Sequence, residues 1–272
     1  MANADERRST VDREVHGPWA VLAGGSEGIG SELADQLGRS GIHLILVARK
    51  PGPLQETADR VAKTHGVQVR TVAGDLLDPE VIQQVRDIAA DVEVGTFIYN
   101  AGANNYGAEF VEGDLASFQK VIDLNVTRQL ELTQHFAGRL KKRGKGAVVL
   151  VGSISGYVGH EQIGVYAASK AFTRIFSEGL WSELRPYGVQ VLHFVAGLTR
   201  TPAMERLGVR MDVPGMTVSD PVDVARDLLD HLGDGPVWVV GGNTELVERQ
   251  SGPDRARLIE DVATGMRAMS PR

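Results

Sequence analysis

The chain of 272 residues is 42% hydrophobic and 24% charged, with a net charge of −6. These proportions are those of an ordinary soluble globular protein, and the acidic balance argues against a nucleic-acid groove, which carries a basic stripe. Cysteine is absent, which excludes disulfides, thiol catalysis and thiolate metal sites. The seven histidines are scattered without a His-x-x-x-His pair, so we expect no metal site.

A polar segment, residues 1–17, comes first along the chain. It lacks the apolar core of a signal peptide, so we expect a mobile leader and a cytoplasmic protein. The strongest apolar runs further on, 44–48 and 147–151, are far too short to span a bilayer, so we expect no membrane association.

Seven short apolar runs predict β-strands. They are nearly unbroken, as expected for strands that are covered on both faces. The predicted strands are Trp19–Ala23, His43–Ala48, Val67–Val72, Thr96–Tyr99, Ala147–Val151, Val189–Val195 and Val237–Val240.

Helical patterns lie between these runs, at 28–39, 53–64, 79–90, 115–142, 164–186 and 221–231. Pro79 and Pro221 each follow an aspartate, which suits a helix start. Strands that alternate with helices imply βαβ units and a parallel sheet. We therefore predict a single α/β domain over 18–245, with a Rossmann-type, doubly wound, mostly parallel seven-stranded sheet and helices on both faces.

Two segments do not follow this alternation. The stretch 196–220 is rich in glycine and proline and follows the sixth strand, where an open α/β sheet places its ligand crevice. It could be a lid over the substrate or a surface excursion packed on the core. The C-terminal tail, 246–272, contains a charged helix candidate at 253–268, which could pack on its own domain or on a neighbouring subunit.

A glycine-rich loop follows the first predicted strand and opens the first helix. Its sequence is Gly24-Gly25-Ser26-Glu27-Gly28-Ile29-Gly30, and its glycines permit a tight turn with no side chain between backbone and ligand. The exposed amides and the helix dipole suit a pyrophosphate. A strand, loop and helix in this order favour a dinucleotide site over a plain glycine-rich turn.

The end of the second strand indicates which dinucleotide binds. An acidic residue about 20 positions after the glycines would select NAD(H), but the stretch reads Ala48-Arg49-Lys50. Arg49 could grip a 2′-phosphate, so NADP(H) is favoured and NAD(H) is the alternative. Arg49 and Lys50 could also be solvated loop charges, and Glu27 weighs against a phosphate because it adds negative charge.

Asp75 follows the third strand, immediately before Leu76. Its carboxylate could accept a hydrogen bond from the adenine amino group. It could instead cap the helix at 79–90, although Asp78 fits that task better.

Tyr166 and Lys170 stand four residues apart, and Ser153 lies thirteen residues before the tyrosine. Free tyrosine ionises near pH ~10. A cation one helical turn away would favour the phenolate and lower the pKa of the tyrosine, which could then exchange a proton with a carbonyl or alcohol oxygen. The pair alone could also be an ordinary surface contact.

The full set of motifs resembles the short-chain dehydrogenase/reductase family over about residues 18–242. The motifs are, in order, the glycine loop, Tyr99-Asn100-Ala101-Gly102, Asn125, Ser153 and Tyr166-x-x-x-Lys170. The chain departs from the family pattern at Ala23, where threonine is common, at Tyr99, where asparagine is usual, and at Ala196, where proline is usual. None of these departures removes a proton-transfer group.

The resemblance implies a role for each catalytic residue. Tyr166 would be the general acid in reduction and the base in oxidation, and Lys170 would lower its pKa and bind the nicotinamide ribose. Ser153 would hold the substrate oxygen, and Asn125 would anchor a water that links Lys170 to solvent. The further cofactor contacts that we expect are Asp75, Leu76, Asn100, Ala101, Gly102, Gly197, Thr199 and Thr201.

Several of these residues also have a purely structural interpretation. Ser153 could be a turn serine, and Asn125 could cap or bend its helix. Asn100 could be a turn residue, and Thr201 could cap a short helix that starts near Pro202.

The substrate pocket is expected to draw on 103–106, 154–163 and the 196–220 segment. The candidate substrate residues are Asn104, Tyr106, Ser153, Tyr157, Val158, His160, Ile163, Leu198, Met204 and Leu207. Their mixture favours an apolar or ring-containing carbonyl compound over a small charged acid.

We therefore predict an NADP(H)-dependent oxidoreductase that interconverts a ketone or aldehyde and the corresponding alcohol. A catalytically idle cofactor-sensing protein and a lyase or epimerase are the alternatives. The resemblance also implies a homodimer or homotetramer that forms by pairing of the helices 115–142 and 164–186.

Overall fold

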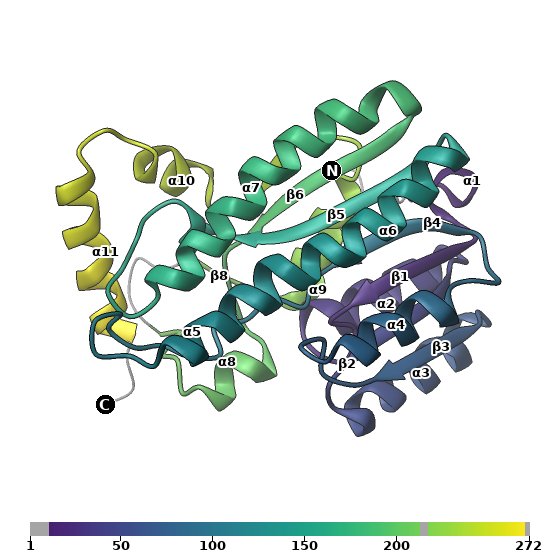
Figure 1. The fold of residues 1–272 in the computed structure, drawn as a ribbon, viewed down its shortest axis with the longest axis horizontal. Helices are drawn as coiled ribbons and strands as arrows, with labels where there is room; N and C mark the ends of the chain where they lie inside the picture. The colour runs from purple at the N-terminus through teal and green to yellow at the C-terminus, as the bar shows by residue number, and fades with distance from the viewer. Residues whose placement is uncertain (1–10, 213–216, 270–272) are drawn as a thin grey trace, which may run out of the picture.

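The computed structural model describes residues 11–212 and 217–269. Its centre is a seven-stranded sheet with the order β3-β2-β1-β4-β5-β6-β9, in which every neighbouring pair is parallel. This is the predicted doubly wound architecture (Figure 1). The strands are β1 Trp19–Ala23, β2 His43–Ala48, β3 Val69–Ala73, β4 Val94–Tyr99, β5 Gly146–Ser153, β6 Val189–Ala196 and β9 Val237–Val239.

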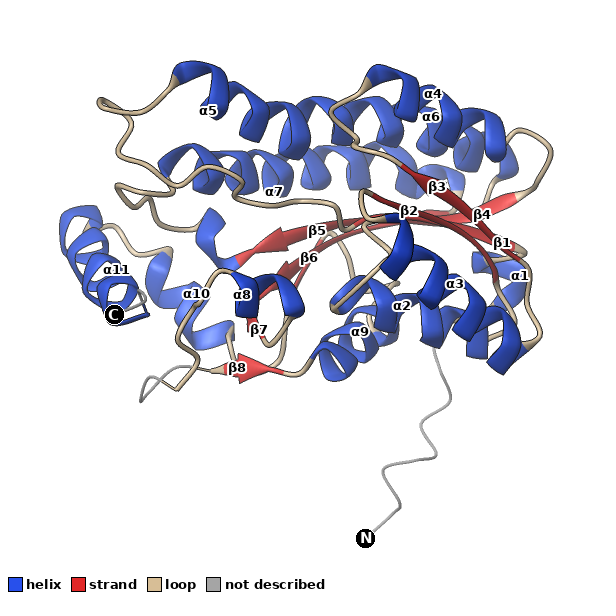
Figure 2. Ribbon diagram, turned by 90° about the horizontal axis from the view of Figure 1, so that it is seen from below, coloured by secondary structure: helices blue, strands red, loops and turns tan. Residues whose placement is uncertain are grey.

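Helices cover both faces of the sheet, which explains why the strands are apolar throughout (Figure 2). On one face lie α2 (Ile29–Arg39), α3 (Pro51–His65) and α9 (Pro221–Asp230), and on the other lie α4 (Pro79–Ile88), α6 (Arg128–Arg143) and α7 (Gly164–Leu184). Alternate residues of β1 enter the two cores: Ala20 and Leu22 face one, and Val21 and Ala23 the other.

Helix starts follow the sequence signals. Asp78 and Asp220 cap α4 and α9 through bonds to the backbone N–H of Glu80 and Val222, and a proline follows each cap. In α2, by contrast, Gly28 stands at the N-cap and no side chain caps the helix. The first amides of α2 are therefore left for another acceptor.

The helix predicted over 115–142 is interrupted. It consists of α5 (Leu115–Ile122), a π-helical turn (Asp123–Thr127) and α6. Within the turn, Asn125 Nδ2 donates to Val121 O at 2.9 Å, and a side chain that bonds the preceding turn in this way competes with the regular helical pattern. Such turns are frequent at functional sites.

The N-terminal segment differs from the predicted mobile leader over 1–17. Residues 13–16 form the short helix α1 (Arg13–His16), and His16 is 3% exposed, with Nε2 2.9 Å from Gln190 Oε1. Thr96 Oγ1 also donates to His16 O at 2.8 Å. Residues 11–17 therefore pack on the domain because a buried imidazole anchors them, and residues 1–10 lie outside the described part.

The 196–220 segment holds β7 (Leu198–Thr199), α8 (Pro202–Arg206) and β8 (Val218–Ser219), with residues 213–216 outside the described part. The chain then ends in α10 (Thr244–Gln250) and α11 (Arg255–Met269), which lie beyond the carboxyl ends of β5 and β6 (Figure 2). We call α10 and α11 the C-terminal wall. It packs on its own domain, where Val247, Leu258 and Ala263 are buried.

The strand order places the ligand crevice. β1 lies between β2 and β4, so the chain winds in opposite directions from this point, and open α/β sheets bind ligands outside the carboxyl ends of such strands. The glycine loop leaves β1 there, and Ser153 ends β5 at the same edge.

Candidate active site

The glycine loop, residues 24–30, is held by close backbone contacts. Gly24 and Gly28 have positive φ values of 88° and 58°, which glycine adopts at little cost. A methyl group at Gly30 would overlap the carbonyl oxygen of Gly24. Asn100 Nδ2 donates to that same oxygen at 2.9 Å, so Asn100 braces the loop from β4.

This loop fits a pyrophosphate. Gly28 has no side chain to obstruct the uncapped N-terminus of α2, and an N-terminus of this kind attracts phosphate oxygens through its N–H groups and dipole. The side chains of Ile29, Leu76 and Ala101 pack against the core. These three predicted residues would therefore contact a cofactor through their backbone atoms.

The predicted adenine end carries paired charges. Arg49 lies 4.0 Å from Asp75, and Lys50 lies 3.7 Å from Glu27. Glu27 also pairs with Arg206 of α8, and this hydrogen bond lowers the pKa of the Glu27 carboxyl. Glu27 therefore links the glycine loop to the 196–220 segment. Asp75 accepts a bond from the Leu77 N–H, while Asp78 is the helix cap, as the sequence favours.

Tyr166 and Lys170 stand on α7 and Ser153 at the end of β5, as their spacing predicts. Lys170 is 4% exposed, and its Nζ donates to Val151 O at 3.1 Å and lies 5.6 Å from the centroid of the Tyr166 ring. Ser153 Oγ accepts from the Ser155 N–H at 3.2 Å, so it is also the turn serine of the alternative interpretation.

The pKa shifts of the pair differ from the expected direction. Burial raises the pKa of the Tyr166 phenol, and a hydrogen bond with the Ser153 side chain opposes the rise. Burial also lowers the pKa of Lys170 to about 8. Burial of the phenol itself is the largest cause, so the predicted lowering of the pKa of Tyr166 is not found. A neutral phenol at physiological pH is the form that can donate a proton.

Asn125 bends its helix and still has a free acceptor. Its Nδ2 donates to Ala103 O and Val121 O, both at 2.9 Å, whereas its buried Oδ1 has no partner among the described residues. A methyl group at Gly102 would overlap Lys170 Nζ and lie 2.8 Å from Asn125 Oδ1. The two polar atoms therefore converge beside Gly102, an arrangement that suits a shared water.

His193 is a buried neighbour of this group that sequence reasoning missed. It is 1% exposed, and a methyl group at Gly152 would overlap its ring. Burial, followed by the charge of Lys170, lowers the pKa of His193 to about 3. A single histidine in an apolar strand does not reveal from the sequence that its ring lies beside Lys170. The facing Gly152 leaves the space that the ring fills.

The predicted nicotinamide end lies along β7 and α8. Thr199 Oγ1 donates to Gly197 O at 3.1 Å, and Thr201 caps α8 through the Met204 N–H, as its alternative interpretation states. A methyl group at Gly28 would lie 2.9 Å from Thr201 Cγ2, so this segment rests on the glycine loop. A methyl group at Gly197 would lie 2.9 Å from the buried Asn243, another residue that the sequence did not reveal.

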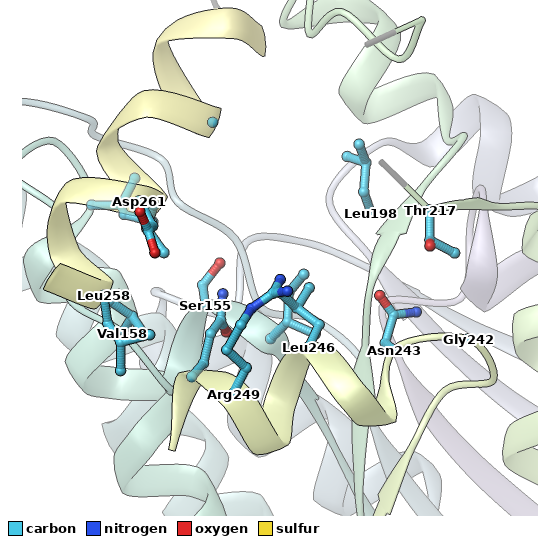
Figure 3. A pocket seen from close by; sticks show the side chains of 15 residues that line it. Ser155, Val158, Leu198, Thr217, Gly242, Asn243, Leu246, Arg249, Leu258 and Asp261 are labelled. Carbon is cyan, nitrogen blue, oxygen red and sulfur yellow. The ribbon is translucent and has the colours of Figure 1, made fainter. Parts of the chain in front are cut away.

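A cavity of about 290 Å³ begins at Ile154 and Ser155, immediately after Ser153 (Figure 3). Ser153 and Tyr166 do not line it, so it adjoins the catalytic group. Among the predicted substrate residues, Val158, Ile163 and Leu198 line it. Its remaining walls include Thr217 and, from the C-terminal wall, Leu246, Arg249, Leu258, Asp261 and Val262. The apolar spacing of Leu258 and Val262 was the signal for this contribution.

Other predicted substrate residues have structural partners. The Tyr106 hydroxyl accepts from the Asp114 N–H at 2.9 Å, and the Arg174 guanidinium lies over the Tyr157 ring at 5.1 Å. His160 is 5% exposed, and its Nδ1 accepts from the Gln162 N–H. Asn104 and Met204 are partly buried, and neither lines the cavity.

Comparison with known proteins shows the family of the chain. The short chain dehydrogenase family model matches residues 18–211. A 7beta-hydroxysteroid dehydrogenase from Clostridium sardiniense is 28% identical over 248 residues, covering 91% of this chain and 95% of that protein. A very-long-chain 3-oxoacyl-CoA reductase from Coccidioides immitis is 31% identical over 221 residues, covering 80% of this chain but only 62% of the reductase.

A solved structure adds a bound cofactor to the comparison. The short-chain dehydrogenase from Sphingobium yanoikuyae in complex with NADPH is 28% identical and superposes with a TM-score of 0.77, covering 92% of this chain and 95% of that one. The chain belongs to the short-chain dehydrogenase family and is an oxidoreductase of that family. Within the described residues, no cluster of side chains could hold a metal ion, and no helix is long and apolar enough to cross a membrane.

Proposed function

We propose that this protein is a cytoplasmic, NADP(H)-dependent oxidoreductase that interconverts a ketone or aldehyde and an alcohol, on an apolar or ring-containing substrate. The observation that carries the proposal is the convergence of Ser153, Tyr166, Lys170 and Asn125 at the edge of the sheet where the glycine loop begins.

The chain's own residues supply binding, orientation and a proton. When bound, the nicotinamide exchanges a hydride with the carbon of the substrate. In the reductive direction Ser153 and the Tyr166 hydroxyl donate hydrogen bonds to the carbonyl oxygen, and Tyr166 then gives up its proton. The raised pKa of Tyr166 keeps the phenol protonated until that step.

Lys170 and Asn125 restore the proton. As negative charge develops on Tyr166, Lys170 stabilises it, and a water held by the free Oδ1 of Asn125 would connect the lysine to solvent. In the oxidative direction the same groups work in reverse, with Tyr166 as the base.

The preference for NADP(H) rests on Arg49 and Lys50. Both side chains are largely exposed at the end of β2, and an arginine can bind a 2′-phosphate with two parallel hydrogen bonds. The NADPH complex of the Sphingobium yanoikuyae relative supports the same choice. The relative named for a hydroxysteroid supports a ring-containing substrate, as does the largely apolar cavity.

Association through α5–α6 and α7 is the proposed oligomeric arrangement, as a homodimer or homotetramer. Phe172 and Ile175 lie on α7 with 40% and 57% of their surface exposed, and pairing of helices would remove this apolar surface from water.

The decisive variant is Tyr166→Phe. It should keep its affinity for NADPH, measured by fluorescence titration against NADH, and lose about 100-fold or more in kcat on a panel of steroid, acyl and cyclic ketones. Normal turnover would show that the acid is another group. Binding of NADPH without turnover by the wild type on every ketone would favour a cofactor-sensing role.

A further inference from the structure

The cavity beside Ser155 has a polar feature that the proposed reaction does not use. Arg249 is the single cation among the described residues that line it. Arg249 is an exposed residue, and its guanidinium has no hydrogen bond or ion pair with any residue in the described ranges. In Figure 3 its side chain extends from α10 into the space that the labelled residues enclose.

The walls around Arg249 are held in place. Arg255, at the start of α11, donates to Tyr157 O at 2.6 Å and to Gln250 O at 2.5 Å. The first bond fastens the C-terminal wall to the loop that follows Ser153, and the second joins α11 to the end of α10. Leu258, on α11, is 8% exposed. The position of Arg249 relative to the catalytic group is therefore set by a packed structure.

The direction of the Arg249 side chain is informative. Glu245 lies one turn before it on α10, a spacing at which a glutamate and an arginine can pair, and no ion pair joins these two exposed residues. Asp261 also lines the cavity, from α11 (Figure 3). The short aspartate side chain points where its position on the helix directs it. The longer arginine side chain can extend away from the cavity or into it.

We propose that the substrate is an apolar ketone, or its alcohol, that carries a carboxylate remote from the reacting carbon, and that Arg249 binds this carboxylate. This inference rests on the proposed function only for the carbonyl end of the substrate, which reacts at Ser153 and Tyr166. The carbonyl lies at Ser153 and Tyr166, the apolar body fills the cavity along Ile154, Val158 and Leu246, and the carboxylate meets the guanidinium. An arginine fork binds a carboxylate with two parallel hydrogen bonds.

The test uses three matched series of probes on the intact protein with NADPH. They are cyclohexanones with a 4-alkyl chain that ends in a carboxylate, a primary amide or an amine, with chains of two, four and six carbons. Wild type should prefer the carboxylate of one chain length over the amide, and Arg249→Gln should reduce that preference by about 10- to 100-fold in kcat/KM. The matched control Asp261→Asn should keep or increase it.

A binding measurement separates this inference from the reaction. The cyclohexane carboxylate without a ketone should bind to wild type by calorimetry and bind at least 10-fold more weakly to Arg249→Gln. Arg249-dependent binding without reduction of any ketone would support the carboxylate site and overturn the reaction. If wild type and Arg249→Gln reduce the acid and the amide equally well, the carboxylate site is overturned and the reaction stays intact. A preference for the amine would also overturn the carboxylate site, because it would indicate that Asp261 binds the remote end of the substrate.

Discussion

The glycine loop and the C-terminal wall bound the same site, but they are built by different means. In the loop, backbone atoms touch backbone atoms, and a methyl group at Gly30 would overlap the Gly24 carbonyl. In the wall, side chains of two late helices meet the cavity, and an arginine hydrogen bond fastens them. The dinucleotide side therefore tolerates little change in sequence, whereas the substrate side can change one side chain at a time.

The largest expected effect comes from Gly30→Ala. Its methyl group would overlap the backbone of Gly24 and crowd Asn100 Nδ2, so we expect loss of NADPH binding and a destabilisation of about 3 kcal/mol or more, measured by urea unfolding. The control is Gly138→Ala in α6, where an added methyl group meets nothing within 4 Å and should stabilise by about 0.5–1 kcal/mol. Unchanged NADPH affinity in Gly30→Ala would remove the contrast between the two regions.

Lys170, on α7 beside Gly102, makes stability depend on pH. Burial lowers the pKa of Lys170 to about 8, below the value of ~10.4 expected in the unfolded chain. Between these values the unfolded state binds more protons, so the free energy of unfolding rises with pH.

Relative to Lys170→Met, the wild type should therefore gain up to about 3 kcal/mol of stability between pH 7.5 and pH 10. Urea unfolding of both proteins at the two pH values measures this difference. A difference that does not change with pH would mean that the ammonium is not desolvated in the folded protein.

Leu258→Ala tests the C-terminal wall by itself. Truncation of this buried side chain should cost about 2 kcal/mol and raise the KM for the ketone, while the Kd for NADPH stays the same. Ile259→Ala is the matched control, because this neighbour on α11 is 41% exposed and its loss should change stability by less than about 0.5 kcal/mol. An equal loss of NADPH affinity in Leu258→Ala would show that the two regions are coupled.

The smallest effect is expected from Glu27→Gln. The carboxylate of Glu27 pairs with Arg206 and Lys50 beside the glycine loop, where it repels phosphate. Its neutralisation should tighten NADPH binding about two- to fivefold, with less effect on NADH. Fluorescence titration measures this, with Glu80→Gln at the start of α4 as the control, and weaker NADPH binding would indicate that the pairs are needed to hold the loop.

Local pattern was sufficient to predict the sheet. β1 and β2 have the predicted bounds because each is a continuous apolar run between turn residues. β4 begins at Val94, two residues before the prediction, because Gly95 weakens the strand pattern. A methyl group at Gly95 would overlap the Gly17 carbonyl, so this glycine accommodates the chain that leads from α1, a contact that no local signal reveals.

The placement of the candidate catalytic residues was predictable for a different reason. One strand and one helix carry the three residues Ser153, Tyr166 and Lys170. Because both elements are regular, the spacing of these residues in the sequence determines their relative positions in the fold. The apolar spacing of Leu258 and Val262 indicated a packed helix, but the position of the C-terminal wall was not predictable, because it depends on how α10 and α11 fold back over the end of β5. The buried His193 and Asn243 were missed because their surroundings come from distant parts of the chain.

The C-terminal wall follows β9 and contributes no strand to the sheet. Exchange of residues 244–269 for the corresponding part of a relative would therefore leave every strand pairing and the glycine loop in place. Such a graft offers protein engineers a route to new substrates with the coenzyme unchanged, provided that the residue at position 255 can still anchor the transplanted helices to the carbonyl of Tyr157.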